Sequence, residues 1–206
     1  MLKSTVPNSS TALRISTPHP GLLYGYKSEK AFSDVACRHQ FASIRTESSA
    51  NNENLTYPFL VVEMKPGRKS DLDAATYQAL GGVASCLQTL EGLQLRFEDF
   101  SSASQTAVDN IVFGIVTNGT ETRLFVSWKD AQGFFMQRIG AFLLREPEQF
   151  HQLRQYLRNI VDWGRGKRLE QIRHGLSHLP KVGISRKRRQ TSSQGSSNRP
   201  VNRRAY

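Results

Sequence analysis

Cysteine is scarce in this sequence, and its scarcity excludes two classes of site. The chain of 206 residues contains two cysteines, Cys37 and Cys86, whose separation fits no metal-ligand spacing. Zinc sites and disulfide frameworks both need several cysteines at short intervals. We therefore expect two ordinary thiols in a reducing compartment.

Long apolar runs are also missing. No apolar segment reaches the roughly 20 residues of a membrane-spanning helix, and the N-terminus lacks the apolar core of a secretory signal. Hydrophobic residues make up 38% of the chain, a modest share because both ends are polar. The length still suits one domain with a real core. We expect an intracellular protein with no membrane partner.

Acidic residues are absent from positions 181–206, where all eight charged residues are basic. The whole chain carries a formal charge of +11, so subtracting these eight charges leaves +3 for residues 1–180. This tail lacks a hydrophobic pattern, as does the Ser/Thr/Pro-rich N-terminus. We predict a folded domain at 18–179 between a disordered N-terminus at 1–17 and a disordered basic tail at 180–206.

The densest basic cluster of the tail comprises Arg186, Lys187, Arg188 and Arg189. Such a cluster is typical of a nuclear import signal, or of an arm that binds nucleic-acid phosphates without reading sequence. The only aromatic residue in the tail is Tyr206, so the pattern does not support recognition by base stacking. A tail that only increases solubility is an alternative of comparable weight.

Hydrophobic periodicity predicts both strands and helices in the folded part. An apolar, β-branched run at 59–63 is typical of a buried strand, and the apolar positions of 71–97 recur at helical steps of three and four. Two adjacent glycines in that helix, Gly81 and Gly82, indicate that the sheet approaches it closely. Asn118 and Gly119 are a two-residue hairpin signal.

The remaining segments complete a fold of the α+β class, with an α/β-like order. Further strands are expected at 22–24, 109–117, 122–128 and 133–139. A short helical turn capped by Ser28 is expected at 28–32. Two more helices are expected, one that opens at Pro147 and one that begins at Leu169, with Gly164 and Gly166 interrupting the helical pattern between them. Residues 33–56 give no clear pattern. We predict a mixed central sheet of about four strands flanked by helices.

The sharpest candidate for chemistry is the pair Glu63 and Lys65 at the end of the 59–63 strand. Side chains two positions apart in a strand project to the same side. A carboxylate can hold a hard cation, and an amine can orient water or stabilise charge developing on a phosphate. The structural alternative is a partly exposed ion pair at a strand end. The spacing alone favours this ion pair over a catalytic pair by roughly ten to one.

The context of this pair resembles the PD-(D/E)XK nuclease superfamily, and most closely its restriction-endonuclease-like domains in uncharacterised fungal proteins. The resemblance covers roughly 18–178, and its strongest part is Tyr-Pro-Phe-Leu-Val-Val-Glu-Met-Lys at 57–65. It also rests on the stretches 18–26 and 75–82 and on Phe113, Gly114 and Phe125. The resemblance implies Glu63 as a metal ligand, Lys65 as the catalytic lysine, Gln78 as a supporting residue, and Mg²⁺-dependent attack on DNA.

One departure from the family pattern concerns the second acid. The family places an aspartate directly after a proline in the preceding strand, but here Gly21 follows Pro20. Glycine has no side chain to ligate a metal. The role therefore either moves to a nearby acid, with Asp34 and Glu29 the options, or the site is inactive. A truncated or degenerate copy of the domain is the interpretation that we favour, at about two to one over an active enzyme.

Three functions remain open from the sequence. The first is a degenerate nuclease-like domain, inactive or weakly active, that binds nucleic acid through its basic tail. The second is an active Mg²⁺-dependent DNA endonuclease that uses Glu63 and Lys65. The third is a non-catalytic protein-interaction scaffold. His174 and His178 have a spacing that suits a metal, but without a third ligand we interpret them as solvated histidines. The sequence indicates no oligomeric state.

Overall fold

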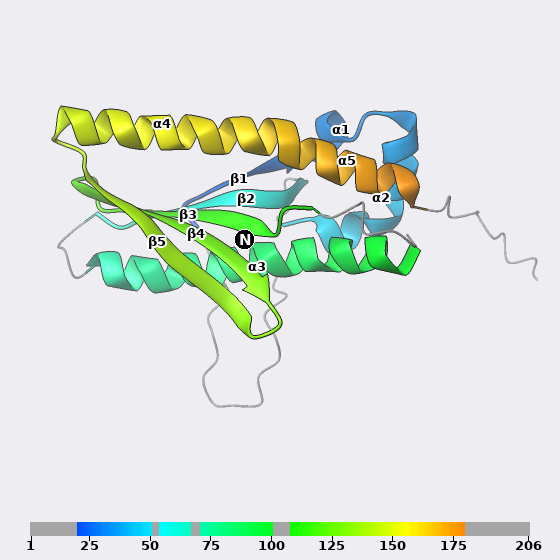
Figure 1. Cartoon of the computed structure of the whole chain (residues 1–206), viewed down its shortest axis with the longest axis horizontal. Coiled ribbons are helices and arrows are strands. Elements are labelled where there is room, and N and C mark those ends of the chain that lie inside the picture. The colour runs from blue at the N-terminus through cyan, green and yellow to red at the C-terminus, as the bar shows by residue number, and fades with distance from the viewer. Residues whose placement is uncertain (1–19, 51–53, 67–70, 101–107, 180–206) are drawn as a thin grey trace, which may run out of the picture.

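A mixed five-stranded sheet with helices on both faces forms the centre of the structure (Figure 1). The computed structural model describes residues 20–50, 54–66, 71–100 and 108–179. Both expected tails, 1–17 and 180–206, lie outside these ranges. The strands are β1 (Leu22–Lys27), β2 (Leu55–Met64), β3 (Ile111–Thr117), β4 (Glu121–Asp130) and β5 (Gly133–Leu143). The α-helices are α1 (Ser28–Ala31), α2 (Val35–Ser48), α3 (Asp71–Phe100), α4 (Pro147–Trp163) and α5 (Leu169–His178).

The strand order follows the chain, β1-β2-β3-β4-β5. β1 is antiparallel to β2, β2 is parallel to β3, and β3, β4 and β5 form an antiparallel meander. The predicted α+β fold with a mixed sheet is therefore confirmed, with five strands where about four were expected.

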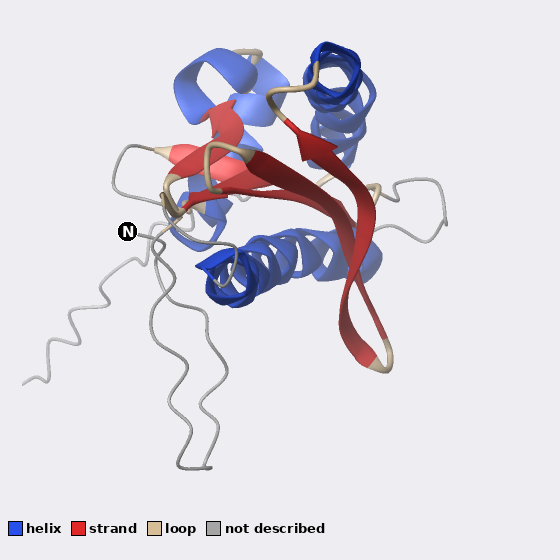
Figure 2. Ribbon diagram, turned by 90° about the vertical axis from the view of Figure 1, so that its left-hand side faces the viewer, coloured by secondary structure: helices blue, strands red, loops and turns tan. Residues whose placement is uncertain are grey.

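Helix α3 connects the two parallel strands and covers one face of the sheet (Figure 2). Its apolar stripe is buried against β2 and β3, where Val83 and Leu87 pack with Val61 and Val112. A Cβ atom on Gly82 would lie 3.1 Å from Cγ1 of Val61. The close approach of the sheet that the glycine pair predicted is confirmed at this position.

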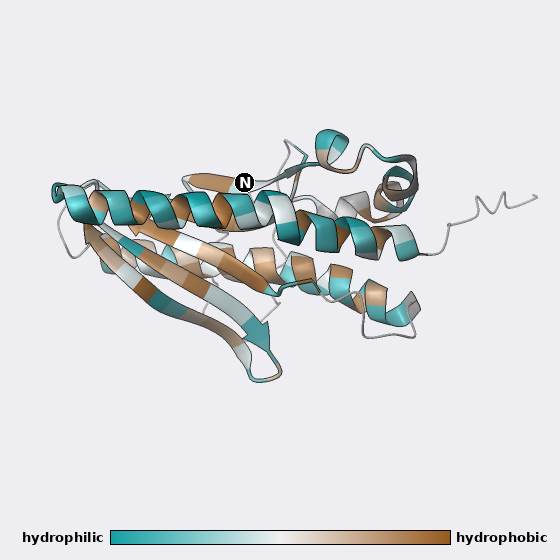
Figure 3. Ribbon diagram, turned by 45° about the horizontal axis from the view of Figure 1, so that its top comes forward, coloured by the Kyte–Doolittle hydropathy of each residue, from teal (hydrophilic) through white to brown (hydrophobic). Residues whose placement is uncertain are grey.

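Helix α4 covers the opposite face (Figure 2). Leu153 and Ile160 of this helix pack into the largest apolar cluster, together with Ile115, Leu124 and Phe142 of the sheet. Their spacing of seven residues places them on one side of the helix, so the other side faces solvent. Figure 3 shows that hydrophilic residues recur along that outer side.

The far end of α3 extends beyond the sheet and packs against α5 and α2. Helices α1, α2 and α5 lie together at one end of the molecule, and α3 and α4 both begin at the other (Figure 1). Leu90 and Phe97 of α3 share the main apolar cluster with Ile172 and Leu176 of α5. None of the described helices is long and apolar enough to cross a membrane.

Three local features were left open by the sequence or differ in detail from the prediction. Residues 33–56 gave no clear pattern, but most of them form α2 and the start of β2. Ser28 is the first residue of α1 rather than its cap, and the cap position, Lys27, makes no capping side-chain bond. The expected break at Gly164 and Gly166 is a π-helical turn, η1 (Gly164–Arg168), that joins α4 to α5 without a loop.

Candidate functional site

Glu63 lies one residue before the end of β2 and faces α3. Its neighbour two positions back, Val61, packs with Val83 of α3, and alternate strand residues share a face. Only 4% of Glu63 is exposed. In the sheet register Glu63 pairs with Val116 of β3, which in turn pairs with Arg123 of β4. The carboxyl group is thus buried at the edge of an apolar patch.

The carboxyl group of Glu63 has one hydrogen bond from the protein and one free oxygen. The backbone N–H of Gly21 donates to it, while Oε1 has no hydrogen-bond partner among the described residues. Burial raises the pKa of Glu63, and the Gly21 hydrogen bond and the charge of Lys65 offset part of that effect. A buried carboxylate with an unused oxygen is costly, because desolvation is not fully compensated.

Lys65 follows directly after β2, and the structure places it beside the same edge. Its backbone N–H donates to the carbonyl oxygen of Thr117 at 2.9 Å, which continues the parallel pairing with β3. The residue is half-buried. Lys65 is close enough to lower the pKa of Glu63, but the two form no ion pair within the described part of the chain.

Gln78 comes to the same end of the sheet from α3. Gly82, one helical turn later, lies over Val61, and α3 runs opposite to β2. Moving back four residues along the helix and forward two along the strand covers about 6 Å in each case. The register therefore places Gln78 near Glu63, but its side chain is exposed and has no hydrogen bond to the described residues.

Asp34, the expected second metal ligand, does not come near Glu63. It is the N-cap of α2 and follows β1, whose last residue, Lys27, pairs with Leu55 at the beginning of β2. Glu63 is eight residues further along that strand, or roughly 26 Å. Glu29 in α1 also lies at the end of the sheet where β2 begins, away from Glu63. Neither acid can share a metal ion with Glu63, because β1 carries the chain away from it.

Gly21 occupies the position where the resemblance calls for an aspartate. It precedes Leu22, which pairs with Val62, so the antiparallel register sets Gly21 opposite Glu63. A Cβ atom there would lie 3.3 Å from the carbonyl oxygen of Val62 and 3.4 Å from Cε of Met64. The chain thus presents a backbone N–H to Glu63 where the family pattern has a second carboxylate.

The described residues do not fit the two-acid Mg²⁺ site that the resemblance implies. Glu63 supplies one carboxylate oxygen that is free to ligate, but no group of three or more His, Cys, Asp or Glu residues that could hold a metal occurs in the described ranges. Mg²⁺ demands near-octahedral oxygen ligation and is usually held by one or two carboxylates plus substrate phosphates. No catalytic step through a metal follows from this arrangement.

A charged network beside this site was not predicted. Arg123 of β4 bonds Asp73 of α3 at 2.7 Å and Glu121 of β4 at 2.9 Å. These two carboxylates raise the pKa of Arg123. Glu121 lies one residue before the strand expected at 122–128 and two positions from Arg123, and this spacing was the available signal. Because both acids are engaged by Arg123, this network joins α3 to the sheet.

A buried arginine was also missed. Arg168 is 0% exposed, and its Nη1 donates to the hydroxyl of Tyr26 and the carbonyl oxygen of Tyr57. The guanidinium carbon lies 5.6 to 5.7 Å from the ring centroids of Tyr26, Phe59 and Trp163. The signal was present in the sequence, because position 168 continues the four-residue spacing of Ile160 and Gly164.

The other sequence candidates take simple roles. Cys37 and Cys86 are free and buried, as two ordinary thiols would be. His174 and His178 lie one turn apart in α5, where Nδ1 of His178 is 2.7 Å from the carbonyl oxygen of His174. The basic cluster Arg186, Lys187, Arg188 and Arg189 lies outside the described residues.

Comparisons with known proteins place the chain in one family. Residues 4–176 match a family described as a domain of unknown function, DUF7924. Neither the curated proteins nor the solved structures contain a match. The matched range covers most of the chain and includes every described element of the sheet. The chain therefore belongs to the DUF7924 family.

Proposed function

We propose that this protein is a nuclease-like domain that has lost efficient phosphodiester cleavage and now binds nucleic acid. The observation that carries the proposal is the N–H of Gly21 at the position of the second carboxylate beside Glu63. The remaining parts of the resemblance, Lys65 and Gln78, lie at the same end of the sheet. They support a nuclease ancestry, and the missing acid supports its loss of activity.

The electrostatics of Glu63 support the same conclusion. A metal-binding carboxylate works best when it is ionised, but burial raises the pKa of Glu63 and so favours its neutral form. A second carboxylate would need a cation to offset the repulsion between the two charges. With Gly21 in its place, the site has no second charge that would need a cation, and it lacks the ligands to hold one tightly.

Nucleic-acid binding is assigned to the basic tail. Arg186, Lys187, Arg188 and Arg189 would neutralise phosphates, and the counterions released would make the affinity fall steeply with salt. The same cluster is proposed as a nuclear import signal. A reporter protein carrying residues 181–206 should enter the nucleus, and one with the four residues changed to Gln should not.

Plasmid cleavage in Mg²⁺ tests the proposed loss of activity. The wild-type protein should nick DNA no faster than the Glu63→Ala and Lys65→Ala variants, which serve as its background controls. Cleavage that needs Mg²⁺ and disappears in both variants would establish the active endonuclease instead. Absence of both cleavage and DNA affinity would leave a protein-interaction scaffold.

A further inference from the structure

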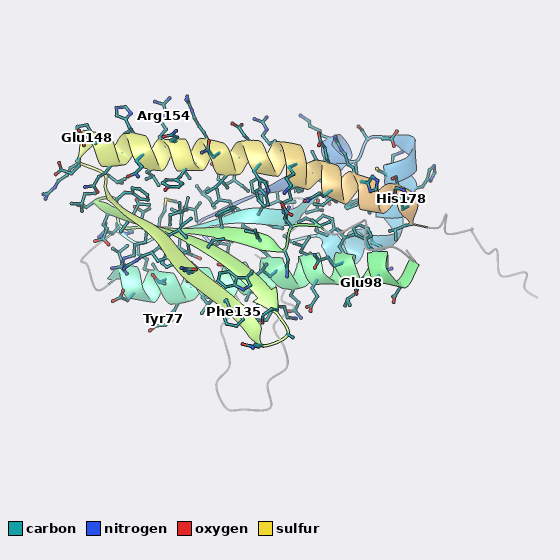
Figure 4. All side chains as sticks on the ribbon, in the orientation of Figure 1. Tyr77, Glu98, Phe135, Glu148, Arg154 and His178 are labelled. Atoms are coloured by element: carbon teal, nitrogen blue, oxygen red, sulfur yellow. The ribbon has the colours of Figure 1, made fainter. Side chains whose placement is uncertain are left out.

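The outer side of α4 carries a row of arginines that has no partner in the described structure. Arg154, Arg158 and Arg165 are all exposed and recur at steps of four and seven, which places them on one side of the helix and the turn that follows it. Figure 4 shows Arg154 pointing away from the sheet. None of the three forms an ion pair with any described residue.

The neighbouring cations differ from this row because they are already engaged. Lys167 lies 3.0 Å from Oδ2 of Asp109, Arg168 is buried, and Nε of Arg173 donates to the carbonyl oxygen of Ala31. Asp162 is exposed between Arg158 and Arg165 on the same side of the helix, and it pairs with neither arginine. The three arginines and Asp162 together leave a net charge of +2, from 3 − 1, on this side of the helix.

We propose that this row, which we call the arginine row (Arg154, Arg158 and Arg165), binds the phosphodiester backbone of a nucleic acid. The inference rests on the nucleic-acid-binding half of the proposed function and adds a second, folded contact surface to the basic tail. From Arg154 to Arg165 the row extends roughly 16 Å along the helix. A nucleic-acid strand advances ~3.4 Å per phosphate along its axis, so the row spans about five phosphates.

The chemistry of the row favours phosphate over the other anionic partners. Guanidinium groups match the oxygens of a phosphate bidentately, and they stay charged at any physiological pH. A different flank of α4 from the row carries amides and one aromatic ring, which line a hollow: Gln152, Gln155, Tyr156 and Asn159. Amide side chains and an aromatic ring can contact base edges and faces.

A membrane surface fits the same helix poorly. An amphipathic helix binds lipid through its apolar side, but in α4 that side is buried against the sheet through Leu153 and Ile160. The arginine row also lies on the opposite face of the sheet from Glu63, which faces α3 (Figure 2). Nucleic acid bound to α4 is therefore held away from Glu63, which agrees with binding that is not followed by cleavage.

The test compares two full-length variants that lose the same charge. One changes Arg154, Arg158 and Arg165 to Gln, and the control changes three other exposed cations, Lys30, Arg38 and Arg138, to Gln. Fluorescence anisotropy with labelled single-stranded and duplex oligonucleotides gives the affinity at several salt concentrations. The row variant should weaken binding about tenfold or more and reduce the salt slope by roughly 2.7 for three lost phosphate contacts, with little change in the control.

A third full-length variant separates this inference from the assignment to the tail. It changes Arg186, Lys187, Arg188 and Arg189 to Gln. If only the tail variant loses affinity, the arginine row has no role and the tail assignment stands; if only the row variant loses it, the tail assignment fails and the row stands. Equal losses in the row variant and the control, or tighter binding to polyglutamate or anionic vesicles than to oligonucleotides, would overturn the inference. The relative affinities for the two oligonucleotides identify the form of the backbone bound.

Discussion

At the residue scale, the buried carboxyl group of Glu63 has a cost in stability that its surroundings offset only in part. Its carboxyl group is buried beside Val116 and has an oxygen with no described partner. Such a group is costly inside a protein, because a buried charge must be paired or neutralised. A nuclease would compensate this cost with a bound cation, whereas this chain offers the N–H of Gly21 and the nearby charge of Lys65.

Replacing Glu63 by Gln should stabilise the protein at alkaline pH. The pKa of Glu63 is raised above 4.5 in the folded state, so the folded chain holds this proton more tightly than the unfolded chain. Its contribution to stability is complete below the unfolded pKa and is lost as pH rises through the folded pKa. We expect Glu63→Gln to raise the melting temperature by about 2–4 °C near pH 8, with a smaller gain near pH 5.

Thermal melts of the two proteins at both pH values measure this effect. A gain of equal size at both pH values would show that the charge of Glu63 is not its cause. Lower stability of the variant at alkaline pH would mean that the carboxylate is paired in a way that the described residues do not reveal.

Arg168 should be more important for stability than any exposed cation. Changing it to Ala removes hydrogen bonds to Tyr26 and Tyr57 and leaves a cavity among three rings. We expect a loss of about 3–5 kcal/mol in the free energy of unfolding. Arg168→Met should lose less, because the thioether chain fills the space between the rings.

Urea denaturation of both variants provides the comparison. The exposed substitution Arg138→Ala is the control and should change stability by less than about 0.5 kcal/mol. A loss from Arg168→Ala as small as that of the control would contradict the role assigned to the buried guanidinium.

At the element scale, two helical glycines have opposite surroundings, and only Gly175 lies in a contact between helices. A Cβ atom on Gly175 of α5 would lie 2.2 Å from Cε2 of Phe97, while one on Gly92 of α3 would meet nothing within 4 Å. Gly175→Ala should therefore displace the Phe97 ring and cost about 1–3 kcal/mol. Gly92→Ala should stabilise α3 by up to about 1 kcal/mol, because alanine is the better helix former.

Chemical denaturation of the two alanine variants checks this pair. Opposite signs are expected, and a stable Gly175→Ala variant would mean that α5 does not pack on α3 as described. A destabilised Gly92→Ala variant would contradict the exposure of that helical position.

The helices and strands also differ in how well the sequence predicted them. The β2 strand and the α3 helix were clear because Val61 and Leu87 lie in continuous patterns that local spacing reveals. Helix α2 was not, because its interior alternates polar residues with Phe41 and Ile44, which are buried by distant parts of the chain. Similarly, the π-helical turn forms where Gly164 lets Phe59 of another element come close.

The candidate site was less predictable than the fold. Glu63, Lys65 and Gln78 follow from strand and helix periodicity, so their shared place at one end of the sheet was accessible. Asp34 was wrong as a partner, because its place depends on the direction of β1, which pairs antiparallel to β2. The Gly21 hydrogen bond involves the backbone, and side-chain patterns carry no signal for it.

At the scale of the whole molecule, the sheet separates two surfaces of different chemistry. Helices α3 and α4 cover opposite faces of the sheet (Figure 1). Glu63 faces α3, and the arginine row lies on the outer side of α4. A nuclease would bring phosphate and metal ligands to a single place. Here the positive surface and the buried carboxyl group are apart, which agrees with the proposed binding of nucleic acid without cleavage.

The proposed loss of activity depends on Gly21, which leaves Glu63 without a second carboxylate to share a metal ion. Titration calorimetry with Mg²⁺ on the wild-type protein, Gly21→Asp and the uncharged control Gly21→Asn tests it most directly. We expect no measurable Mg²⁺ binding to the wild type or to Gly21→Asn, and binding to Gly21→Asp that disappears when Glu63 is also changed to Gln. Mg²⁺ binding to the wild type that Glu63→Gln abolishes would show that Glu63 holds a metal ion without a carboxylate at position 21.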